Sequence, residues 1–195
     1  MIQTIYDNNC KCSSDINEHL PTLYNMALTV QTITEMGTRN GSSTSAFLAA
    51  ICNTNNTLTS IDLFRSSIID TFLRQENFKF IQADTLKIEI ENTDLLFIDT
   101  LHTYFQLFSE LTHHSKKVSK YIVLHDTVSF GNHDEQFYQP TDLVKMSDVV
   151  KETTKTGLLD AITDFLKTED GKNWSIKTVY TNNNGLTVLE RNSTT

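Results

Sequence analysis

A glycine-containing turn and a later acid carry the first chemical signal in this sequence. The turn follows a short apolar run and reads Glu35-Met36-Gly37-Thr38-Arg39-Asn40-Gly41-Ser42-Ser43. Gly37 allows a sharp turn, Gly41 lets the backbone approach a ligand, and the next helix offers free N–H groups to a carboxylate or phosphate. Asp62 ends the following predicted strand, where a carboxylate can accept both hydroxyls of a ribose. The combination predicts a site for a nucleoside-type cofactor.

Further polar side chains follow later apolar runs. Asp84, Asp99 and the pair His125-Asp126 each lie at or just after the end of a predicted strand, as Asp62 does. Ligands of parallel sheets bind at the carboxyl ends of the strands. Because all of these residues belong to that edge, we expect them to form one site.

Strands and helices must alternate to bring these residues together, and the hydrophobic spacing supports this. Expected strands cover residues 32–35, 57–61, 78–81, 95–98 and 121–124, and expected helices include residues 21–27, 46–51, 68–73, 104–111 and 158–166. Continuous apolar runs such as 95–98 are typical of strands buried on both faces of a parallel sheet. Two terminal strands, 175–180 and 186–189, flank an Asn-Asn-Asn-Gly turn and predict a closing hairpin. The pattern indicates an α/β fold.

The composition narrows the class of protein. The 195 residues suffice for one α/β domain, and the net charge of −8 argues against partners such as nucleic acid or an anionic membrane. No apolar run has the length of a membrane span, and the N-terminus is too polar for a signal peptide. Three cysteines form no disulfide framework, so a cytoplasmic location is expected.

The motifs together resemble the class I S-adenosylmethionine-dependent methyltransferases. The residues that carry the resemblance are Glu35-x-Gly37-x-x-x-Gly41-x-Ser43, Asp62, Phe97-Ile98-Asp99-x-x-His102-x-Tyr104 and Leu124-His125-Asp126-Thr127. Within that superfamily the chain is most similar to macrocin-type sugar O-methyltransferases and cephalosporin hydroxylase-like proteins. The resemblance implies a single Rossmann-like domain with a seven-stranded, mostly parallel sheet, an antiparallel last strand, and helices on both faces.

The resemblance also implies which residues bind S-adenosylmethionine. The loop residues around its methionine end would be Glu35, Gly37, Thr38, Gly41, Ser42 and Ser43. Asp62 would hold the ribose hydroxyls, Asp84 would lie near the adenine, and Asp99 would lie beside the sulfonium centre.

Whether a divalent ion takes part stays open at this point. In relatives that use one, the equivalent of Asp99 and an acidic pair after the next strand supply oxygen ligands. Here that pair is His125-Asp126, so one carboxylate is replaced by an imidazole. Hard ions prefer oxygen, which puts Mg²⁺ in doubt and makes a borderline ion such as Mn²⁺ the better candidate for Asp99, His125 and Asp126.

The implied reaction is methyl transfer to a hydroxyl of a small-molecule or glycan acceptor, most simply a sugar. His125 or His102 is the expected base, since imidazole titrates near neutral pH, and Asp99 completes the expected catalytic set. Two other functions remain open: a non-catalytic S-adenosylmethionine-binding protein, and an NAD-dependent oxidoreductase that shares the glycine turn and the second-strand acid. Association into a homo-oligomer is also open.

Residues 1–30 are expected to form an N-terminal helical cap, and residues 31–195 the methyltransferase domain with an insertion at about 128–155. That insertion is too long for an ordinary connection and predicts a lid. Its aromatic residues Phe130, Phe137 and Tyr138 would cover the acceptor, with Gly131 as a hinge.

Three expectations concern side chains outside the motifs. Cys52 closes an apolar helical run and should be buried, whereas the pair His113-His114 should be solvated. The segment Asn132-His133-Asp134-Glu135 is expected to be a surface loop.

Overall fold

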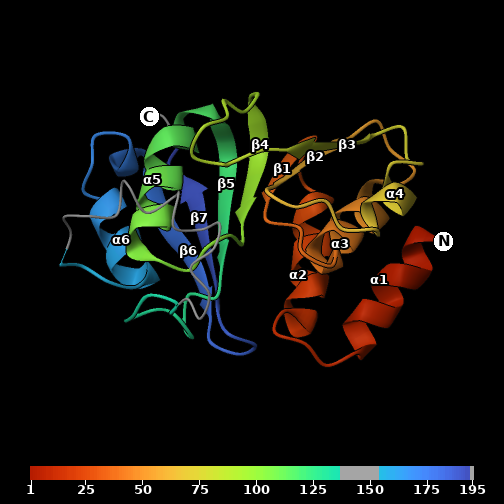
Figure 1. Cartoon of the computed structure of the whole chain (residues 1–195). Helices are drawn as coiled ribbons and strands as arrows, with labels where there is room; N and C mark the ends of the chain where they lie inside the picture. Colours follow the sequence, from red (N-terminus) through yellow and green to blue (C-terminus); the bar gives the residue numbers. More distant parts are fainter. Residues whose placement is uncertain (137–153, 194–195) are drawn as a thin grey trace.

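A seven-stranded sheet runs through the middle of the molecule (Figure 1). The computed structural model describes residues 1–136 and 154–193. The strand order is β3-β2-β1-β4-β5-β7-β6. The strands are β1 (Thr32–Met36), β2 (Thr57–Asp62), β3 (Phe78–Gln82), β4 (Thr93–Ile98), β5 (Val118–His125), β6 (Trp174–Tyr180) and β7 (Leu186–Arg191).

Strand direction follows the predicted pattern. The pairs from β3 through β5 are parallel, and β7 is antiparallel to both β5 and β6. The predicted α/β fold, with a seven-stranded sheet and an antiparallel last strand, is therefore confirmed. Each predicted strand is present, with ends shifted by a few residues at most.

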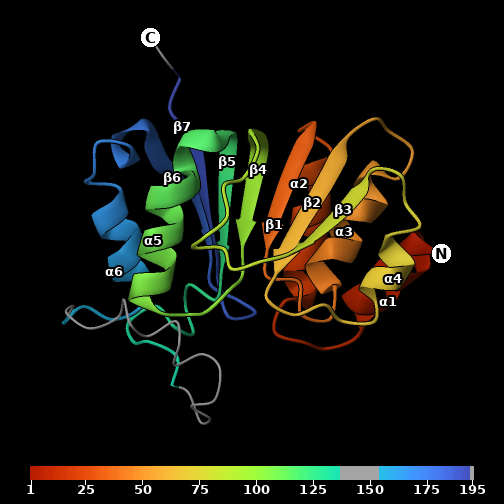
Figure 2. The same ribbon diagram turned by 45° about the horizontal axis from the view of Figure 1, so that its top comes forward.

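Helices cover both faces of the sheet (Figures 1 and 2). The helices are α1 (Ile2–Lys11), α2 (Leu20–Ala27), α3 (Ser42–Ile51), α4 (Ile69–Phe72), α5 (Tyr104–His114) and α6 (Leu158–Phe165). Because side chains alternate along a strand, Leu95 and Phe97 of β4 pack with α1, α2 and α3, whereas Leu96 and Ile98 pack with α5 and α6. The sheet is thus buried on both sides, as its continuous apolar runs predicted.

Helix α1 lies within the predicted N-terminal helical cap, but a separate helix at these residues was not predicted, because their sequence is mostly polar. Its apolar residues are nevertheless spaced by three to four positions: Ile2 is buried, and Ile5, Tyr6 and Cys10 pack against the same core as α3. The Asn9 side-chain amide also donates to the Ser45 hydroxyl of α3 at 3.0 Å. Helix α1 therefore shares a core with the sheet, which its polar composition did not indicate.

Two expectations about single side chains were wrong. Cys52 is exposed, since α3 ends at Ile51 and Cys52 lies just beyond the buried face. His114 is fully buried at the end of α5, where its Nε2 lies 2.7 Å from the Thr85 carbonyl oxygen, and only His113 is exposed. Among the described residues, no helix combines the length and hydrophobicity needed to cross a membrane.

Replacing Phe97 by alanine should lower the free energy of unfolding by about 3–5 kcal/mol, because a large buried ring is removed from a packed core. Phe97 is 0% exposed and meets the Phe47 ring edge-on at 5.6 Å. Urea unfolding monitored by circular dichroism measures the change. The matched control is Phe64→Ala, at a ring that is 67% exposed, which should change stability little. Equal losses in both variants would contradict the assigned core.

Candidate functional site

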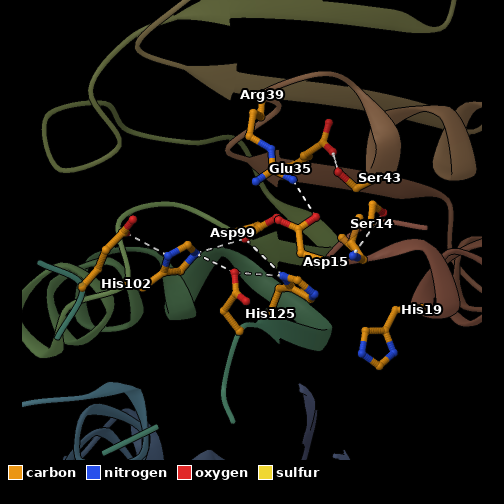
Figure 3. A network of polar contacts seen from close by, with 12 residues as sticks. Ser14, Asp15, His19, Glu35, Arg39, Ser43, Asp99, His102 and His125 are labelled. Atoms are coloured by element: carbon orange, nitrogen blue, oxygen red, sulfur yellow. Dashed lines mark hydrogen bonds and ion pairs between the residues drawn. The ribbon is translucent and has the colours of Figure 1, made fainter. Parts of the chain in front are cut away.

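Predicted polar residues meet at the carboxyl ends of β1, β4 and β5 (Figure 3), and Asp62 at the end of β2 lines the same cavity. A cavity of about 460 Å³ opens at this edge. Among its lining residues are Gly37, Asp62, Ala83, Asp99, His102 and Glu135. The strand order places β1 and β4 side by side at the centre, so the turn after β1 faces the acid after β4.

Glu35 lies inside the fold, behind the cavity. Its carboxylate is 0% exposed and accepts hydrogen bonds from the hydroxyls of Ser43 (2.6 Å) and Thr44 (2.8 Å) on α3 and from that of Ser60 on β2. Burial raises the pKa of Glu35 to about 7, although these hydroxyls oppose the shift. Of the predicted cofactor residues, Glu35 and Ser43 thus bond to each other and join β1, α3 and β2.

The two glycines of the turn are required for different contacts. Gly37 has φ +85°, and a Cβ there would lie 2.0 Å from the Asp99 carbonyl oxygen, so the turn and the end of β4 are in direct contact. Gly41 has φ +76° and precedes the first residue of α3, Ser42. A Cβ on Gly41 would lie 2.6 Å from the Phe72 ring, so packing against α4 requires this glycine.

Asp62 joins the turn to β2. Its Oδ2 accepts from the Thr38 backbone N–H (2.7 Å), the Thr38 hydroxyl (2.9 Å) and the Arg39 N–H (3.1 Å). Its Oδ1 accepts from the Phe64 N–H at 2.9 Å. A carboxylate offers about four acceptor positions, and Oδ1 is the oxygen with capacity left for a ligand. Asp62 lines the cavity, as the ribose-binding prediction requires.

Asp84 is directed elsewhere. Its Oδ1 accepts from the Leu86 N–H at 2.9 Å, and its Oδ2 lies 2.9 Å from Lys87 Nζ. Its neighbours Ala83 and Thr85 line the cavity. The segment after β3 therefore lines the cavity. The carboxylate of Asp84, which was predicted to bind the adenine, instead binds residues of its own turn.

Three carboxylates surround His102. Its Nε2 lies 2.9 Å from Asp126 Oδ2 and 3.3 Å from Asp99 Oδ1, and its Nδ1 lies 2.9 Å from Glu135 Oε2. The Phe130 ring stacks on the imidazole with a centroid distance of 4.8 Å and an interplanar angle of 5°. His102 is therefore held on both ring nitrogens and on one face.

His125 lies deeper than His102, at the end of β5. Its side chain is 1% exposed, and its Nδ1 lies 3.2 Å from Asp126 Oδ2 and 3.4 Å from Asp99 Oδ1. These contacts are ion pairs that lack the alignment of hydrogen bonds. Within the described residues, both ring nitrogens of His125 and Oδ1 of Asp126 are buried without a hydrogen-bond partner.

Charge decides the protonation of both imidazoles. Burial by itself would lower the pKa of His102 and of His125, but the carboxylates of Asp126 and Asp99 raise each pKa to about 10. The same contacts hold the pKa of Asp99 at about 2 and that of Asp126 below its usual range, although burial opposes this. At neutral pH both imidazoles are then protonated donors, which differs from the expected role as free bases.

Asp99, His125 and Asp126 also form a candidate metal centre. One ligand atom from each lies within 4.8 Å of the others. The buried, unpartnered nitrogens of His125 and Oδ1 of Asp126 are the kind of atoms that an ion would satisfy. Two carboxylates with one imidazole fit a borderline divalent ion such as Mn²⁺ better than Ca²⁺.

Several residues of the site were missed in the sequence. Asp134 and Glu135 were expected in a surface loop, but Glu135 holds His102 and Asp134 Oδ1 accepts from the Tyr104 N–H at the start of α5 (2.7 Å). Arg39 lines the cavity and pairs with Asp15 at 2.7 Å, which ties the N-terminal segment to the turn (Figure 3). Their partners are distant in sequence, so spacing offered no signal.

The predicted lid is described only at its two ends. Phe130 stacks on His102, and Gly131 is tightly packed, since a Cβ there would lie 2.7 Å from the Thr127 carbonyl oxygen. Phe137 and Tyr138, on which the lid prediction depends, lie outside the described residues.

Replacing Glu35 by glutamine should flatten the pH dependence of stability between pH 4.5 and 7. The folded-state pKa of Glu35 is raised from 4.5 to about 7. In this interval the native state therefore binds more protons than the unfolded state. The contribution of Glu35 to the free energy of unfolding is complete below pH 4.5 and is lost as the pH rises through 7. Urea unfolding across this range measures the slope. Glu76→Gln, at an exposed site, should keep the wild-type slope; a slope unchanged in Glu35→Gln would contradict the prediction.

The sequence and the structure were compared with known proteins. Residues 34–127, just under half of the chain, match the family model of a methyltransferase domain. Comparison with curated proteins gives no significant match. Many solved structures are similar.

Three of these structures illustrate the likeness. The Podospora anserina methyltransferase PaMTH1 bound to S-adenosylhomocysteine (SAH) is 12% identical, with a TM-score of 0.61 over 98% of this chain and 88% of its own. NodS, an N-methyltransferase from Bradyrhizobium japonicum in complex with SAH, is 14% identical, with a TM-score of 0.58 over 93% and 89%. A Staphylococcus aureus protein assigned as a caffeoyl-CoA O-methyltransferase is 14% identical, with a TM-score of 0.61 over 89% and 83%. The described chain therefore has a Rossmann-like fold that it shares with these methyltransferases, and residues 34–127 match the model of a methyltransferase domain.

Proposed function

We propose that this chain is an S-adenosylmethionine-dependent methyltransferase that acts on a hydroxyl of a sugar or another small molecule. The single observation that carries the proposal is the cavity in residues matched by the methyltransferase model, which extends from Asp62 to Asp99 and His102. Asp62 offers an acceptor for a ribose, and Asp99 lies where the reactive end of the cofactor would meet a second substrate. The SAH bound to PaMTH1 and NodS supports the choice of cofactor.

The loop after β1 would bind the methionine end of the cofactor. Gly37 lets the turn lie directly against the backbone of Asp99, and the start of α3 at Ser42 would present backbone N–H groups to a carboxylate. Thr38 holds the loop in position by donating to Asp62, and Gly41 lets the loop pack closely against Phe72. Glu35 and Ser43 act from behind by fixing the strand and the helix.

The chemistry would be an in-line displacement at the methyl carbon. The acceptor oxygen forms a bond to this carbon, the sulfur leaves with the electron pair of the broken bond, and the hydroxyl proton passes to a base. The sulfonium is already activated, so the protein must mainly position the acceptor and take its proton. Asp99, which faces the cavity with 20% of its side chain exposed, and His102, held by Glu135, are the groups placed to do so.

A divalent ion fits the three ligands Asp99, His125 and Asp126. When bound, it would polarise the acceptor hydroxyl and offset the charge of the two carboxylates. His125 would have to lose its proton to bind the ion. His102, with less negative charge beside its Nε2, would then accept a proton nearer to neutral pH, while Glu135 keeps its Nδ1 protonated.

The non-catalytic alternative has one observation in its favour. With only carboxylates as partners, both imidazoles of the site are protonated at neutral pH and cannot act as bases. Methyl transfer from S-adenosylmethionine to a panel of sugars and small hydroxylated acceptors, with and without Mn²⁺, separates the two functions. Binding of SAH without transfer to any acceptor would favour the alternative.

Replacing Asp62 by asparagine should weaken SAH binding by about 1.5–3 kcal/mol, because a charge-assisted hydrogen bond to the ribose is lost. Isothermal titration calorimetry measures the affinity, and circular dichroism checks the fold. Asp70→Asn, at an exposed carboxylate, is the control and should bind as the wild type does. An intact Asp62→Asn variant with unchanged affinity would remove Asp62 from the cofactor site.

Replacing Asp126 by asparagine should reduce methyl transfer by about 10²-fold or more, since the variant loses one of the three ligands of the divalent ion that would polarise the acceptor hydroxyl. SAH affinity should be unchanged. Asparagine tolerates the backbone φ of +59° at this position, so the fold should be kept. Mn²⁺ binding, measured by calorimetry, should be lost in the same variant. Transfer that survives exhaustive chelation in the wild type would show that no ion is required.

A further inference from the structure

A second buried carboxylate lies behind another wall of the cavity. Glu110 of α5 is 0% exposed, and the roles described above do not involve it. Its Oε1 accepts from the Thr85 hydroxyl at 2.5 Å and from the Gln106 side-chain amide at 2.7 Å, and its Oε2 accepts from the Thr100 hydroxyl at 2.8 Å. Thr85, Thr100 and Gln106 all line the cavity. One internal carboxylate therefore organises three residues of the wall.

This carboxylate determines where the hydrogens of the wall point. With three donors converging on it, Glu110 acts as an acceptor, so the hydroxyl hydrogens of Thr85 and Thr100 point away from the cavity. The Gln106 amide uses its two hydrogens on Glu110 and on the Thr85 oxygen, the latter at 3.1 Å. The NH₂ group must therefore face Glu110, which fixes the direction of the amide.

This arrangement does not use the side-chain carbonyl oxygen of Gln106. Across residues 1–136 and 154–193 no hydrogen bond to it is found, and it is not among the fully enclosed polar atoms without a partner. Gln106 borders the cavity, so this oxygen is available to a ligand. These three side chains thus turn lone pairs and not hydrogens toward the cavity, and they favour a ligand group that donates.

The surroundings of this acceptor fit a flat, mostly apolar ring. Ile61, Leu63, Phe64, Ala83 and Leu101 line the cavity beside Thr85 and Thr100. Asp62, the expected ribose partner, lies in the same cavity. Asp84 uses its carboxylate on Leu86 and Lys87 instead. An aromatic ring with an exocyclic amine, attached to a ribose, matches these features.

We propose that the carbonyl oxygen of Gln106 recognises the 6-amino group of the cofactor's adenine, and that Glu110 is a positioning residue that sets the direction of the Gln106 amide. The proposal rests on the proposed function, because the adenine is that of S-adenosylmethionine. Gln106 would then decide which purine the site accepts, since a 6-oxo group would bring a second carbonyl oxygen against the first.

The test compares the affinities of SAH and S-inosylhomocysteine, in which a 6-oxo group replaces the amine. In the wild type, calorimetry should show SAH binding at least about tenfold more tightly, since a site built around a hydrogen bond rejects the analogue that cannot make it. In Gln106→Met this ratio should approach one, mainly through loss of SAH affinity. The control Asp84→Asn should keep the wild-type ratio.

Glu110→Gln separates positioning from a purely structural role. A glutamine at position 110 supplies donors of its own, so the Gln106 amide can rotate and present its NH₂ group to the cavity. The ratio of SAH affinity to S-inosylhomocysteine affinity should then fall, because the Glu110→Gln variant binds S-inosylhomocysteine more tightly than the wild type does. A purely structural role would weaken both ligands equally and leave the ratio unchanged.

A wild-type ratio of one, or a wild-type ratio retained in Gln106→Met, would overturn the proposal while leaving SAH binding, and so the proposed function, intact. If Asp84→Asn loses the preference for SAH and Gln106→Met keeps it, the adenine amine is recognised by Asp84 instead. A wild type that binds neither ligand would overturn both the inference and the proposed function. If Gln106→Met does not fold, the wild-type ratio and Glu110→Gln decide.

Discussion

The hydrogen bonds to the buried carboxylate of Glu35 are the interaction on which the proposed cofactor end of the site depends. They connect the end of β1 to two hydroxyls at the start of α3 and to one on β2. Strand, helix and neighbouring strand are thereby fixed at the point where the chain turns through Gly37. The turn can then lie against the backbone carbonyl group of Asp99. Glu35 thus fixes the geometry of the cavity although it does not line it.

Glu110 follows the same physical logic on the opposite face of the sheet. In both places a carboxylate out of contact with water accepts from surrounding hydroxyls, and burial raises its pKa to about 7. Such a group costs stability unless its partners satisfy it, and in return it fixes their direction. The two glutamates therefore act on the ligand site through the residues that they orient.

The part of the site around Asp99, His102 and His125 is governed by the balance of charge. Asp99, Asp126 and Glu135 surround two imidazoles, which are held protonated, so the cluster is close to neutral although it is rich in ionisable groups. A divalent ion and the imidazole protons would compete for the same carboxylates. This competition would link any metal dependence of the proposed methyl transfer to the ability of His102 to take a proton.

Local sequence was sufficient for the strand and helix pattern, the glycine turn and the acids at the strand ends, because periodicity and backbone preference act over a few residues. It also placed Asp62 and Asp99 at the edge of the sheet where both line the cavity. The tertiary structure alone decided the burial of His114, the direction of Asp84, the contacts of Glu135 and Glu110, and the protonation of His102 and His125. Each of these depends on partners from other elements and on exclusion of water, which no local pattern encodes.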